Sequence, residues 1–348
     1  MISISFLGDI SLNDNYIEYY KNKINPFKVL IPLLCNKDFV IGNLECLAKG
    51  EKGENILKKP RLTSTVETLN FLNNINLKVA NLAHNHIYDH LEDGFLKTTA
   101  FLKKNNIRFM GAGTSFENAQ KPLILSKNDI TIGLLNYVTP DTNPKLPDDA
   151  LVYLNYFDIE KVNNDIAELK KSSDHIVVIM HWGGRVEGGL YPDFDQPAIA
   201  KKLIDMGADL IIGHHSHTFQ PFEVYKGKHI FYSLGNFCFS DFNFEGKITP
   251  LPLRRRITGI INVIFDEKTY RVSLDFFRND NISFSPLSRY INRLKIRNWI
   301  LKNLLRYKSL WNIYFFHKKY ILPFILFINR NDLRFFDKFK RLIKSIKK

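Results

Sequence analysis

Short apolar runs that end in polar residues recur along about the first 280 positions of the chain. Most have the length of a buried strand, and apolar positions at helical spacing lie between several of them. Consecutive strands then end this part of the chain. The alternation predicts a layered α/β fold with mixed sheets. The expected strands are 2–7, 38–45, 77–82, 108–110, 130–136, 175–180, 210–212, 229–234, 259–265 and 271–277, and the longer expected helices are 65–74, 92–104, 158–171 and 196–206.

Five of the expected strands end in side chains that bind metals or transfer protons. In open α/β sheets, functional groups gather at the carboxyl ends of the strands. Imidazole, carboxylate and amide groups together suit divalent transition metals, with Mn, Fe and Zn all compatible. We therefore predict a site for two divalent ions with one carboxylate bridging them. The groups are Asp9, then Asn43 and Glu45, then Asn85 and His86, then His181, and finally His215 and His217.

The segment 209–217 holds the densest set of these groups. Gly213 follows a short apolar strand, and histidines occupy positions 214, 215 and 217. Residues two apart in an extended segment point to the same side. We therefore expect His215 and His217 to project together toward one metal region. The alternative is a polar loop whose histidines bond to neighbouring carbonyls.

The charge of +14 is not spread over the chain. Residues 289–348 hold 17 Lys and Arg against two acids, whereas the first 288 residues hold 32 basic and 33 acidic groups. This change in net charge along the chain predicts a neutral domain at 1–288 and a basic tail at 289–348. Three cysteines without CxxC spacing argue against a disulfide framework and for a reducing compartment.

The segments that would direct the chain to a membrane or out of the cell are not expected. The N-terminus enters an apolar alternation without a basic region or a cleavage site, so we expect no signal peptide. No run of about 20 apolar residues predicts a spanning helix. A cytoplasmic location follows, with peripheral attachment to the inner face of the membrane as an open alternative.

The ordered motifs resemble the CapA-type capsule-synthesis family, of the poly-γ-glutamate synthesis type, which is itself similar to calcineurin-like metallophosphoesterases. The resemblance covers roughly residues 1–280, and its specificity lies in the order of the pieces. These are Gly8-Asp9, Gly42-Asn-Leu-Glu45, Asn81-Leu-Ala-His-Asn-His86 with Asp89, Gly111-Ala-Gly113 with Ala119 and Pro122, His181-Trp-Gly183, Gly213-His-His-Ser-His217 and Ser233-Leu-Gly-Asn-Phe237.

The resemblance implies a four-layer α-β-β-α sandwich with metals at the strand ends and a helical basic extension after it. It also implies that Asp9 and His217 hold the first metal, that Glu45 bridges, and that Asn85, His181 and His215 hold the second. His86 would then assist the leaving group, and a hydroxide bridging the metals would be the nucleophile of a phosphoester-type hydrolysis.

Four positions depart from the patterns of these families. Metallophosphoesterases usually carry a histidine where this chain has Ser11, and the capsule family often lacks it too. His84 and Ser216 replace an Asn and a Pro that are frequent there. Arg185 lies where a Glu commonly follows the His-Trp-Gly motif, with Glu187 as a substitute to be tested.

Further polar residues near the motifs are candidates for supporting roles. We expect Asn43 to orient Glu45, and His84 and His214 to pack beside the ligands. Asp89 would either pair with a histidine or begin the next helix. Asn236 would either line the site or make a turn. The run Arg254, Arg255 and Arg256 would either bind an anionic substrate or lie exposed as a solvated charge run.

The basic tail has a separate pattern. Phe335, Phe339, Leu342 and Ile346 share one helical face, and Lys and Arg fill the others. A basic amphipathic helix of this kind is typical of segments that lie on an anionic membrane surface. Packing on the domain or on a second subunit and contact with an anionic polymer stay open. Nucleic acid is not expected as a partner, because no recognition motif accompanies the charge.

Two functions are consistent with these patterns. The first is a metal-dependent hydrolase in capsule or cell-surface polymer synthesis, acting on an anionic polymer or a phosphorylated substrate. The second is a non-catalytic, membrane-associated component of the polymer-synthesis machinery. The sequence leaves the metal, the substrate and the oligomeric state open.

Overall fold

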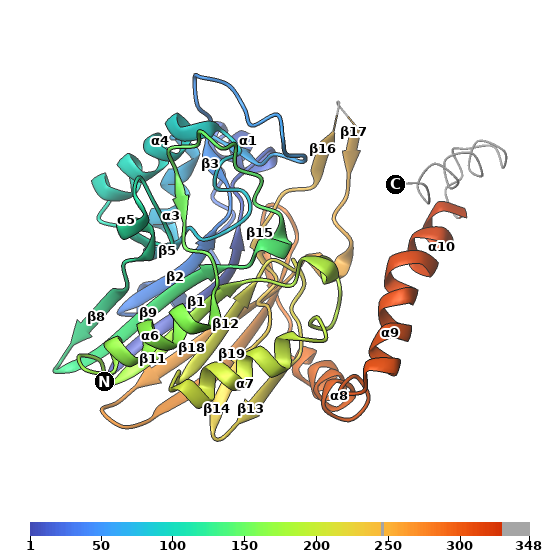
Figure 1. Cartoon of the computed structure of the whole chain (residues 1–348). Coiled ribbons are helices and arrows are strands. Elements are labelled where there is room, and N and C mark those ends of the chain that lie inside the picture. Colours follow the sequence, from blue (N-terminus) through green and yellow to red (C-terminus); the bar gives the residue numbers. More distant parts are fainter. Residues whose placement is uncertain (245–246, 329–348) are drawn as a thin grey trace. The chain divides into compact units, whose positions relative to one another are not determined.

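The alternating apolar runs form two β-sheets that pack face to face in the computed structural model (Figure 1). The structure describes residues 1–244 and 247–328. The chain divides into two compact units, residues 1–295 and 296–348. The boundary at residue 288 stays a prediction.

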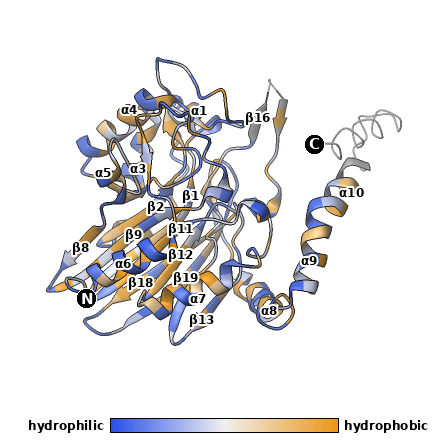
Figure 2. Ribbon diagram, in the orientation of Figure 1, coloured by the Kyte–Doolittle hydropathy of each residue, from blue (hydrophilic) through white to orange (hydrophobic). Residues whose placement is uncertain are grey.

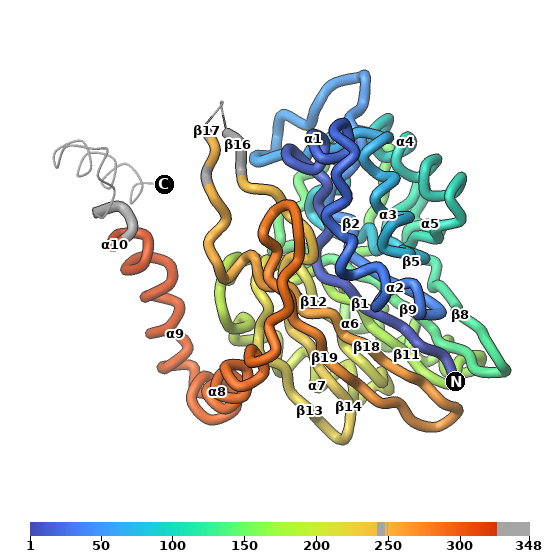
Figure 3. Tube along the Cα trace, turned by 180° about the vertical axis from the view of Figure 1, so that it is seen from behind, coloured from blue at the N-terminus to red at the C-terminus, as the bar shows by residue number. Residues whose placement is uncertain are grey.

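The first sheet is eight-stranded and holds the N-terminal strand near its middle. Strand β1 (Ile2–Ile10) pairs in parallel with β2 (Phe39–Leu44) and antiparallel with β18 (Ile257–Phe265). Seen from behind, β1, β18 and β19 lie side by side (Figure 3). The other strands are β5 (Leu77–Asn81), β6 (Arg108–Met110), β15 (Asn236–Cys238), β19 (Tyr270–Asn279) and β20 (Phe284–Pro286).

The second sheet is six-stranded, and its four inner strands run in parallel. Parallel strands carry their carboxyl ends to the same edge, so the ends of neighbouring strands meet there. The order is β13 (Phe222–Tyr225), β14 (Lys228–Phe231), β12 (Leu210–His214), β11 (His175–His181), β9 (Ile130–Val138) and β8 (Leu123–Lys127).

The core between the sheets follows the period of two expected of strands. Ile4 and Phe6 of β1 face Ile132, Val177 and Ile212 of the second sheet, and all five are fully or almost fully buried. Such burial stabilises by roughly 1.5–3 kcal/mol for each large apolar side chain. Figure 2 shows this distribution, with hydrophobic residues along the strands and hydrophilic residues along many of the loops that join them.

Helices cover the outer faces of the two sheets and complete four layers (Figure 1). A second apolar core lies between the first sheet and its helices and includes Leu34, Leu72 and Phe95. On the outer face of the second sheet, α6 and α7 bury Ile166 and Leu203. The helices are α1 (Asn15–Lys21), α2 (Ile31–Cys35), α3 (Phe71–Asn74), α4 (Leu91–Lys104), α5 (Phe116–Gln120), α6 (Ile159–Leu169) and α7 (Gln196–Met206).

Most expected elements are present, and the differences are local. The helix expected over 65–74 is reduced to a 3₁₀ turn at Thr68–Asn70 and the short α3. Strands β8 and β13 were not expected; each pairs antiparallel with a neighbour at an edge of the second sheet. The short strands are β3 (Leu47–Ala48), β4 (Thr63–Ser64), β7 (Ala112–Gly113), β10 (Tyr153–Leu154), β16 (Phe242–Phe244) and β17 (Lys247–Thr249).

The C-terminal region is helical as far as the structure describes it. Helix α8 (Tyr290–Asn303) precedes α9 (Lys308–Phe316), a π-helical turn at His317–Ile321 and α10 (Leu322–Ile328). The basic amphipathic helix expected around 334–347 lies outside the described residues. Among the helices that are described, none combines the length and hydropathy needed to cross a bilayer.

Candidate metal centre

The candidate ligands meet at one edge, where strands of both sheets end. Strand β1 delivers Asp9, and the residue after β2 is Glu45. From the second sheet, β11 ends in His181 and β12 ends in His214, just before His215. All five side chains are buried. The parallel registers of β1 with β2 and of β11 with β12 explain the convergence, because they align the carboxyl ends of paired strands.

Glu45 lies at the middle of the cluster. Its Oε1 is 3.9 Å from Nε2 of His181, and its Oε2 is 3.9 Å from Nδ1 of His217. Each carboxylate oxygen therefore faces a different imidazole. This is the placement that a carboxylate needs in order to bind two cations at once.

Two sets of ligand atoms share Glu45. The first metal group is Asp9, Glu45 and His217, and the second is Glu45, His181 and His215. In each group the ligand atoms lie within 4.8 Å of one another and the residues are buried. In the second group, Nε2 of His181 is 3.0 Å from Nδ1 of His215 and 3.0 Å from Oδ1 of Asn85. Asn85 thus adds an amide oxygen to that group.

The donor atoms of both groups fit divalent cations. Oδ2 of Asp9 and both carboxylate oxygens of Glu45 are buried without a hydrogen bond in the described structure. Buried polar atoms are nearly always partnered, so three unpartnered carboxylate oxygens at one point call for a positive group. Oxygen and imidazole donors of this kind suit Mn, Fe or Zn. The residues show that metals fit here but leave their number and identity open.

The pKa values of the cluster indicate the same need for positive charge. Burial raises the pKa of Glu45 to about 8, against the opposing effect of His217. Burial lowers the pKa of His217, but Glu45 and Asp9 outweigh it and raise this pKa to about 9. The histidines bonded to Asp9 hold its pKa well below the usual range, although burial opposes them. Protons thus stabilise this cluster, and a metal ion would displace them.

The second group contains histidines that favour the neutral form. Burial, followed by the charge of His215, holds the pKa of His181 well below its usual value. Burial also lowers the pKa of His215 to about 4. A neutral imidazole has a lone pair for a metal, so both rings are ready to act as ligands near neutral pH.

His215 and His217 reach the centre by a different backbone path from the one expected. Strand β12 ends at His214, and φ is 91° at His215 and 56° at His217. The segment is therefore left-handed at both residues and not extended, so the expected reason for their convergence was wrong. Their rings nevertheless lie 6.1 Å apart, with His215 in the second metal group and His217 in the first.

His86 lies beside the two metal groups. Its Nδ1 is 2.6 Å from Oδ2 of Asp89, and its Nε2 is 3.9 Å from Oε1 of Glu45. Asp89 also accepts a hydrogen bond from the backbone of Leu62 at 2.7 Å. Of the two roles considered for Asp89, the structure shows pairing with a histidine, since the N-cap of α4 is His90.

Three supporting residues contact the ligands directly. Nδ2 of Asn43 donates to Oδ1 of Asp9 at 2.9 Å, so Asn43 orients Asp9 and not Glu45 as we expected. Nδ1 of His214 is 3.1 Å from the same oxygen. Oδ1 of Asn236 is 2.9 Å from Nδ1 of His217, which favours the site role of Asn236 over the turn role.

His84 and Ser11 fill positions where the family patterns have other residues. Nδ1 of His84 accepts a hydrogen bond from the backbone N–H of His86 at 3.1 Å, and burial lowers the pKa of His84 to about 3. This contact fits the expected packing role. Oγ of Ser11 donates to Oδ1 of Asn13 at 2.7 Å. The hydroxyl of Ser11 is therefore engaged within its own loop.

The three arginines do not form an exposed charge run, so that alternative was wrong. Nε of Arg254 donates to the carbonyl of Gly188 at 3.2 Å, and Nη2 of Arg255 is 3.5 Å from Oε1 of Glu187. Arg256 forms an ion pair with Asp241. All three are half-buried. Glu187 lines the cavity beside His215 and His217, whereas Arg185 pairs with Asp193 at 2.6 Å.

A cavity of about 350 Å³ opens onto the cluster; we call it the metal-centre cavity. Its walls include Asn85, His86, His215 and His217. One further wall residue, Lys58, was not expected; its ammonium donates to the carbonyl of Asn85, and the residue is only 7% exposed. Burial lowers the pKa of Lys58 to about 8. Lys58 lies in a polar segment whose composition predicts only a loop. The structure shows that this loop folds over the site.

Comparison with known sequences gives relatives of one kind. The family described as bacterial capsule synthesis protein PGA_cap matches residues 3–241. The PGA biosynthesis protein CapA of Bacillus subtilis (strain 168) is 33% identical over 253 residues, which cover 69% of this chain and 63% of that protein. The capsule biosynthesis protein CapA of Bacillus anthracis is 29% identical over 284 residues, covering 76% and 66%. The matched part is thus less than two thirds of either relative.

Solved structures share the fold. The crystal structure of a putative 5'-nucleotidase from Staphylococcus aureus superposes with a TM-score of 0.50 at 15% sequence identity. The match covers 85% of this chain and 58% of that one. The expected sandwich of the calcineurin-like metallophosphoesterase type is thereby confirmed as the fold.

Proposed function

The chain belongs to the bacterial capsule synthesis family, and from this premise we propose that it is a metal-dependent hydrolase of a phosphoester-type bond in cell-surface polymer synthesis. The observation that carries the proposal is the position of Glu45 between two buried sets of ligand atoms. A single carboxylate shared by two such sets is the arrangement that two-metal hydrolysis requires.

The ligand set combines residues of both sheets. Asp9, Glu45 and His217 would hold one ion, and Glu45, Asn85, His181 and His215 the other. When bound, the two ions would make a water molecule acidic enough to attack near neutral pH and would offset the charge that develops on the phosphoryl oxygens. Asn43 and His214 would keep the carboxylate of Asp9 in place through their contacts with Oδ1.

His86 would serve the leaving group. Its Nδ1 is held by Asp89, which fixes the ring and favours a proton on that nitrogen. The other nitrogen, Nε2, is on the side of Glu45 and the cavity. From there it would hold or donate a proton to the oxygen that departs.

The charges around the metal-centre cavity favour an anionic substrate. Lys58, Lys59 and Lys145 line it, and none of the three has an ion pair in the described structure. The two carboxylates of the lining are already engaged, Asp141 with the backbone of Gly184 and Glu187 with Arg255. Cations without an ion pair beside a metal centre repel the metals unless an anion lies between them. An anionic polymer or a phosphorylated substrate supplies that anion.

A second function is favoured by Ser11. Where metallophosphoesterases usually add a histidine to the first metal, this side chain is a hydroxyl bonded to Asn13. A weakened first site would leave a protein that keeps the fold and acts as a non-catalytic component of polymer assembly. Attachment to an anionic membrane surface through the basic tail belongs to this proposal and would serve the hydrolase equally.

One experiment separates the two functions. Purified full-length protein is assayed for bound metal by elemental analysis and for turnover of bis(p-nitrophenyl) phosphate, before and after His217→Ala. The control is His229→Ala, a half-buried histidine of β14 that lies outside both metal groups. Stoichiometric metal and turnover that His217→Ala abolishes and His229→Ala retains support the hydrolase. Absence of both from the unsubstituted protein supports the assembly component.

A further inference from the structure

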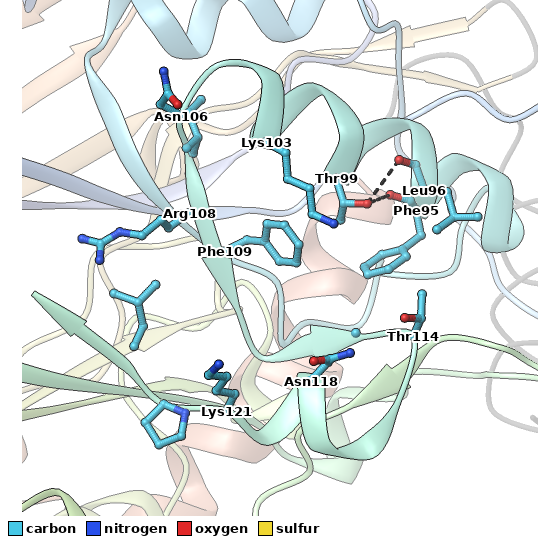
Figure 4. A pocket seen from close by; sticks show the side chains of 14 residues that line it. Phe95, Leu96, Thr99, Lys103, Asn106, Arg108, Phe109, Thr114, Asn118 and Lys121 are labelled. Atoms are coloured by element: carbon cyan, nitrogen blue, oxygen red, sulfur yellow. Dashed lines mark hydrogen bonds between the residues drawn. The ribbon is translucent and has the colours of Figure 1, made fainter.

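A second, larger hollow lies beside β6 and β8, which are edge strands of the two sheets, and none of the metal ligands lines it. It has a volume of about 850 Å³ and is formed by α4, β6, α5 and the start of β8; we call it the α4 groove (Figure 4). Small-molecule sites usually measure roughly 300–1,000 Å³. The α4 groove shares no lining residue with the metal-centre cavity.

The floor and walls of the α4 groove are largely apolar. Phe95 and Leu96 come from α4, Phe109 from β6, and Pro122 and Leu123 from the segment that enters β8. Leu96 is 43% exposed, and it belongs to this shared apolar lining and not to an isolated surface position. The groove therefore leaves an apolar side chain in contact with water that a hydrocarbon ligand would cover.

The polar group nearest this floor is turned away from it. Oγ1 of Thr99 donates to the carbonyls of Phe95 and Leu96 in its own helix, as the dashed lines in Figure 4 show. The hydroxyl is thereby satisfied within α4 and leaves its methyl group for the groove. Thr99 thus offers contact area more than a hydrogen bond, and the other neutral polar side chains of the lining are Asn106, Thr114 and Asn118.

The charges that line the α4 groove have one sign. Lys103, Arg108 and Lys121 line it, and its walls contain no Asp or Glu. None of the three cations has an ion pair in the part of the chain that the structure describes. Nζ of Lys103 lies 5.9 Å from the ring centre of Phe109, so one cation stands directly over the apolar surface. In Figure 4, Lys103 and Lys121 come from opposite walls.

We propose that the α4 groove binds a single-chain anionic amphiphile, in which a hydrocarbon chain ends in a carboxylate or a phosphate. The chain would cover Leu96, Phe109 and Pro122, and the anion would lie between the ammonium groups of Lys103 and Lys121. An uncharged lipid would leave these cations without a partner, and a purely polar anion would leave Leu96 in water. The combination of both features selects the amphiphile. The proposal does not depend on catalysis at the metal centre.

Photo-crosslinking on the full-length protein tests this proposal. The probe is a long-chain fatty acid with a diazirine in its chain, kept below its critical micelle concentration, and its methyl ester is the uncharged counterpart. Labelled peptides are identified by mass spectrometry, and affinity is measured by competition with the unmodified fatty acid. We expect saturable labelling within residues 95–123 and roughly tenfold weaker binding of the ester, as loss of a pair of cation contacts predicts.

Three variants make the test specific. Lys103→Met combined with Lys121→Met should weaken fatty-acid binding about tenfold and leave ester binding unchanged. Leu96→Glu should abolish binding of both probes. Lys202→Met, at an exposed lysine of α7, is the matched control and should bind as the unsubstituted chain does.

The opposite results would overturn the proposal. Labelling outside 95–123, for example in the basic tail at 289–348, assigns the amphiphile to another surface. Equal affinity for acid and ester removes the role of the cations, as does an unchanged affinity in the Lys103 and Lys121 double variant. If Leu96→Glu does not fold, the double variant decides alone, because both lysines are exposed and replaceable without leaving a cavity.

Discussion

Nδ1 of His86 lies 2.6 Å from Oδ2 of Asp89, while Nε2 of the same ring lies 3.9 Å from Oε1 of Glu45. One imidazole thus connects a buried carboxylate outside the metal groups to the carboxylate shared by them. The orientation of His86 depends on Asp89, and Asp89 is itself fixed by the backbone N–H of Leu62.

Replacing Asp89 should therefore alter proton transfer more than metal binding. With Asp89→Asn we expect kcat to fall about tenfold to a hundredfold while the metal content stays unchanged. Burial lowers the pKa of His86 and Asp89 opposes this, so removing the carboxylate lowers that pKa further. If protonated His86 assists the leaving group, the alkaline limb of the kcat profile moves to lower pH. Asp148→Asn, at an exposed carboxylate, is the control; an unshifted limb in Asp89→Asn would exclude the role of His86.

Replacing Glu45 should affect both metals, whereas replacing Asp9 should affect one. We expect Glu45→Gln to reduce bound metal from about two ions per chain to well below one, because both groups lose a charged ligand. Asp9→Asn should retain about one ion, held by His181, His215, Asn85 and Glu45. Elemental analysis of dialysed protein measures both. Equal metal loss in the two variants would contradict the bridging position of Glu45.

The stability of the metal-free protein should fall between pH 6.5 and 8. The pKa of Glu45 is raised to about 8 and that of His217 to about 9, so the folded chain keeps protons that the unfolded chain releases. Stability from such groups is present at low pH and is lost as pH rises through the folded pKa. We expect the Tm in EDTA to drop by roughly 5 °C over this interval.

Metal should reverse this dependence. Added Mn²⁺ competes with protons for the same atoms, so its stabilising effect should grow as pH rises. Differential scanning fluorimetry with and without Mn²⁺ measures both trends. His217→Ala should flatten the metal-free profile. A Tm that rises between pH 6.5 and 8 in EDTA would show that the cluster is not protonated as described.

Lys58 should determine affinity for anionic substrates. Lys58→Met keeps the aliphatic stem but removes the ammonium from the metal-centre cavity, so KM for bis(p-nitrophenyl) phosphate should rise about tenfold with kcat less affected. Lys202→Met, at an exposed lysine of α7 that does not line the cavity, is the control. A fall in kcat at constant KM would assign Lys58 to the chemical step instead.

Replacing Gly8 should destabilise the protein, because Gly8 lies in the strand that carries Asp9 and packs closely against the neighbouring backbone. A Cβ at Gly8 would lie 2.0 Å from the carbonyl oxygen of Gly235, where β1 approaches β15. Gly8→Ala should destabilise by about 3 kcal/mol or more in urea unfolding, since neither backbone can move freely. Gly53→Ala, at φ 110° with open space around it, should cost only about 1 kcal/mol. Similar losses in both variants would mean that the contact is not tight.

The sequence predicted the parts of the fold and site that follow from strand periodicity. Parallel strands align their carboxyl ends, so polar residues after apolar runs were expected to meet, and Asp9, Glu45 and His181 do lie together. Their roles as ligands stay predictions. The order of the motifs, through the family resemblance, also implied two metal sites that share Glu45. Strand periodicity alone does not predict this sharing.

Other features depend on tertiary contacts that no local pattern records. The left-handed backbone at His215 and His217 is set by the turn after β12, and the extended segment we expected would have directed their side chains differently. Lys58 reaches the cavity only because its loop folds back over Asn85. Strands β8 and β13 depend on antiparallel neighbours, so short polar-flanked runs such as these are recognised only once the sheet is assembled.

The candidate metal ligands come from two separate layers. Asp9 and Glu45 belong to the eight-stranded sheet, and His181 and His215 to the six-stranded one. Ions held by both would cross-link the layers at one edge, and pulling the layers apart would require releasing them. Their binding free energy would then appear as resistance to global unfolding and to proteolysis. Removing such ions would accordingly weaken the hold between the two layers as well as any activity at the site.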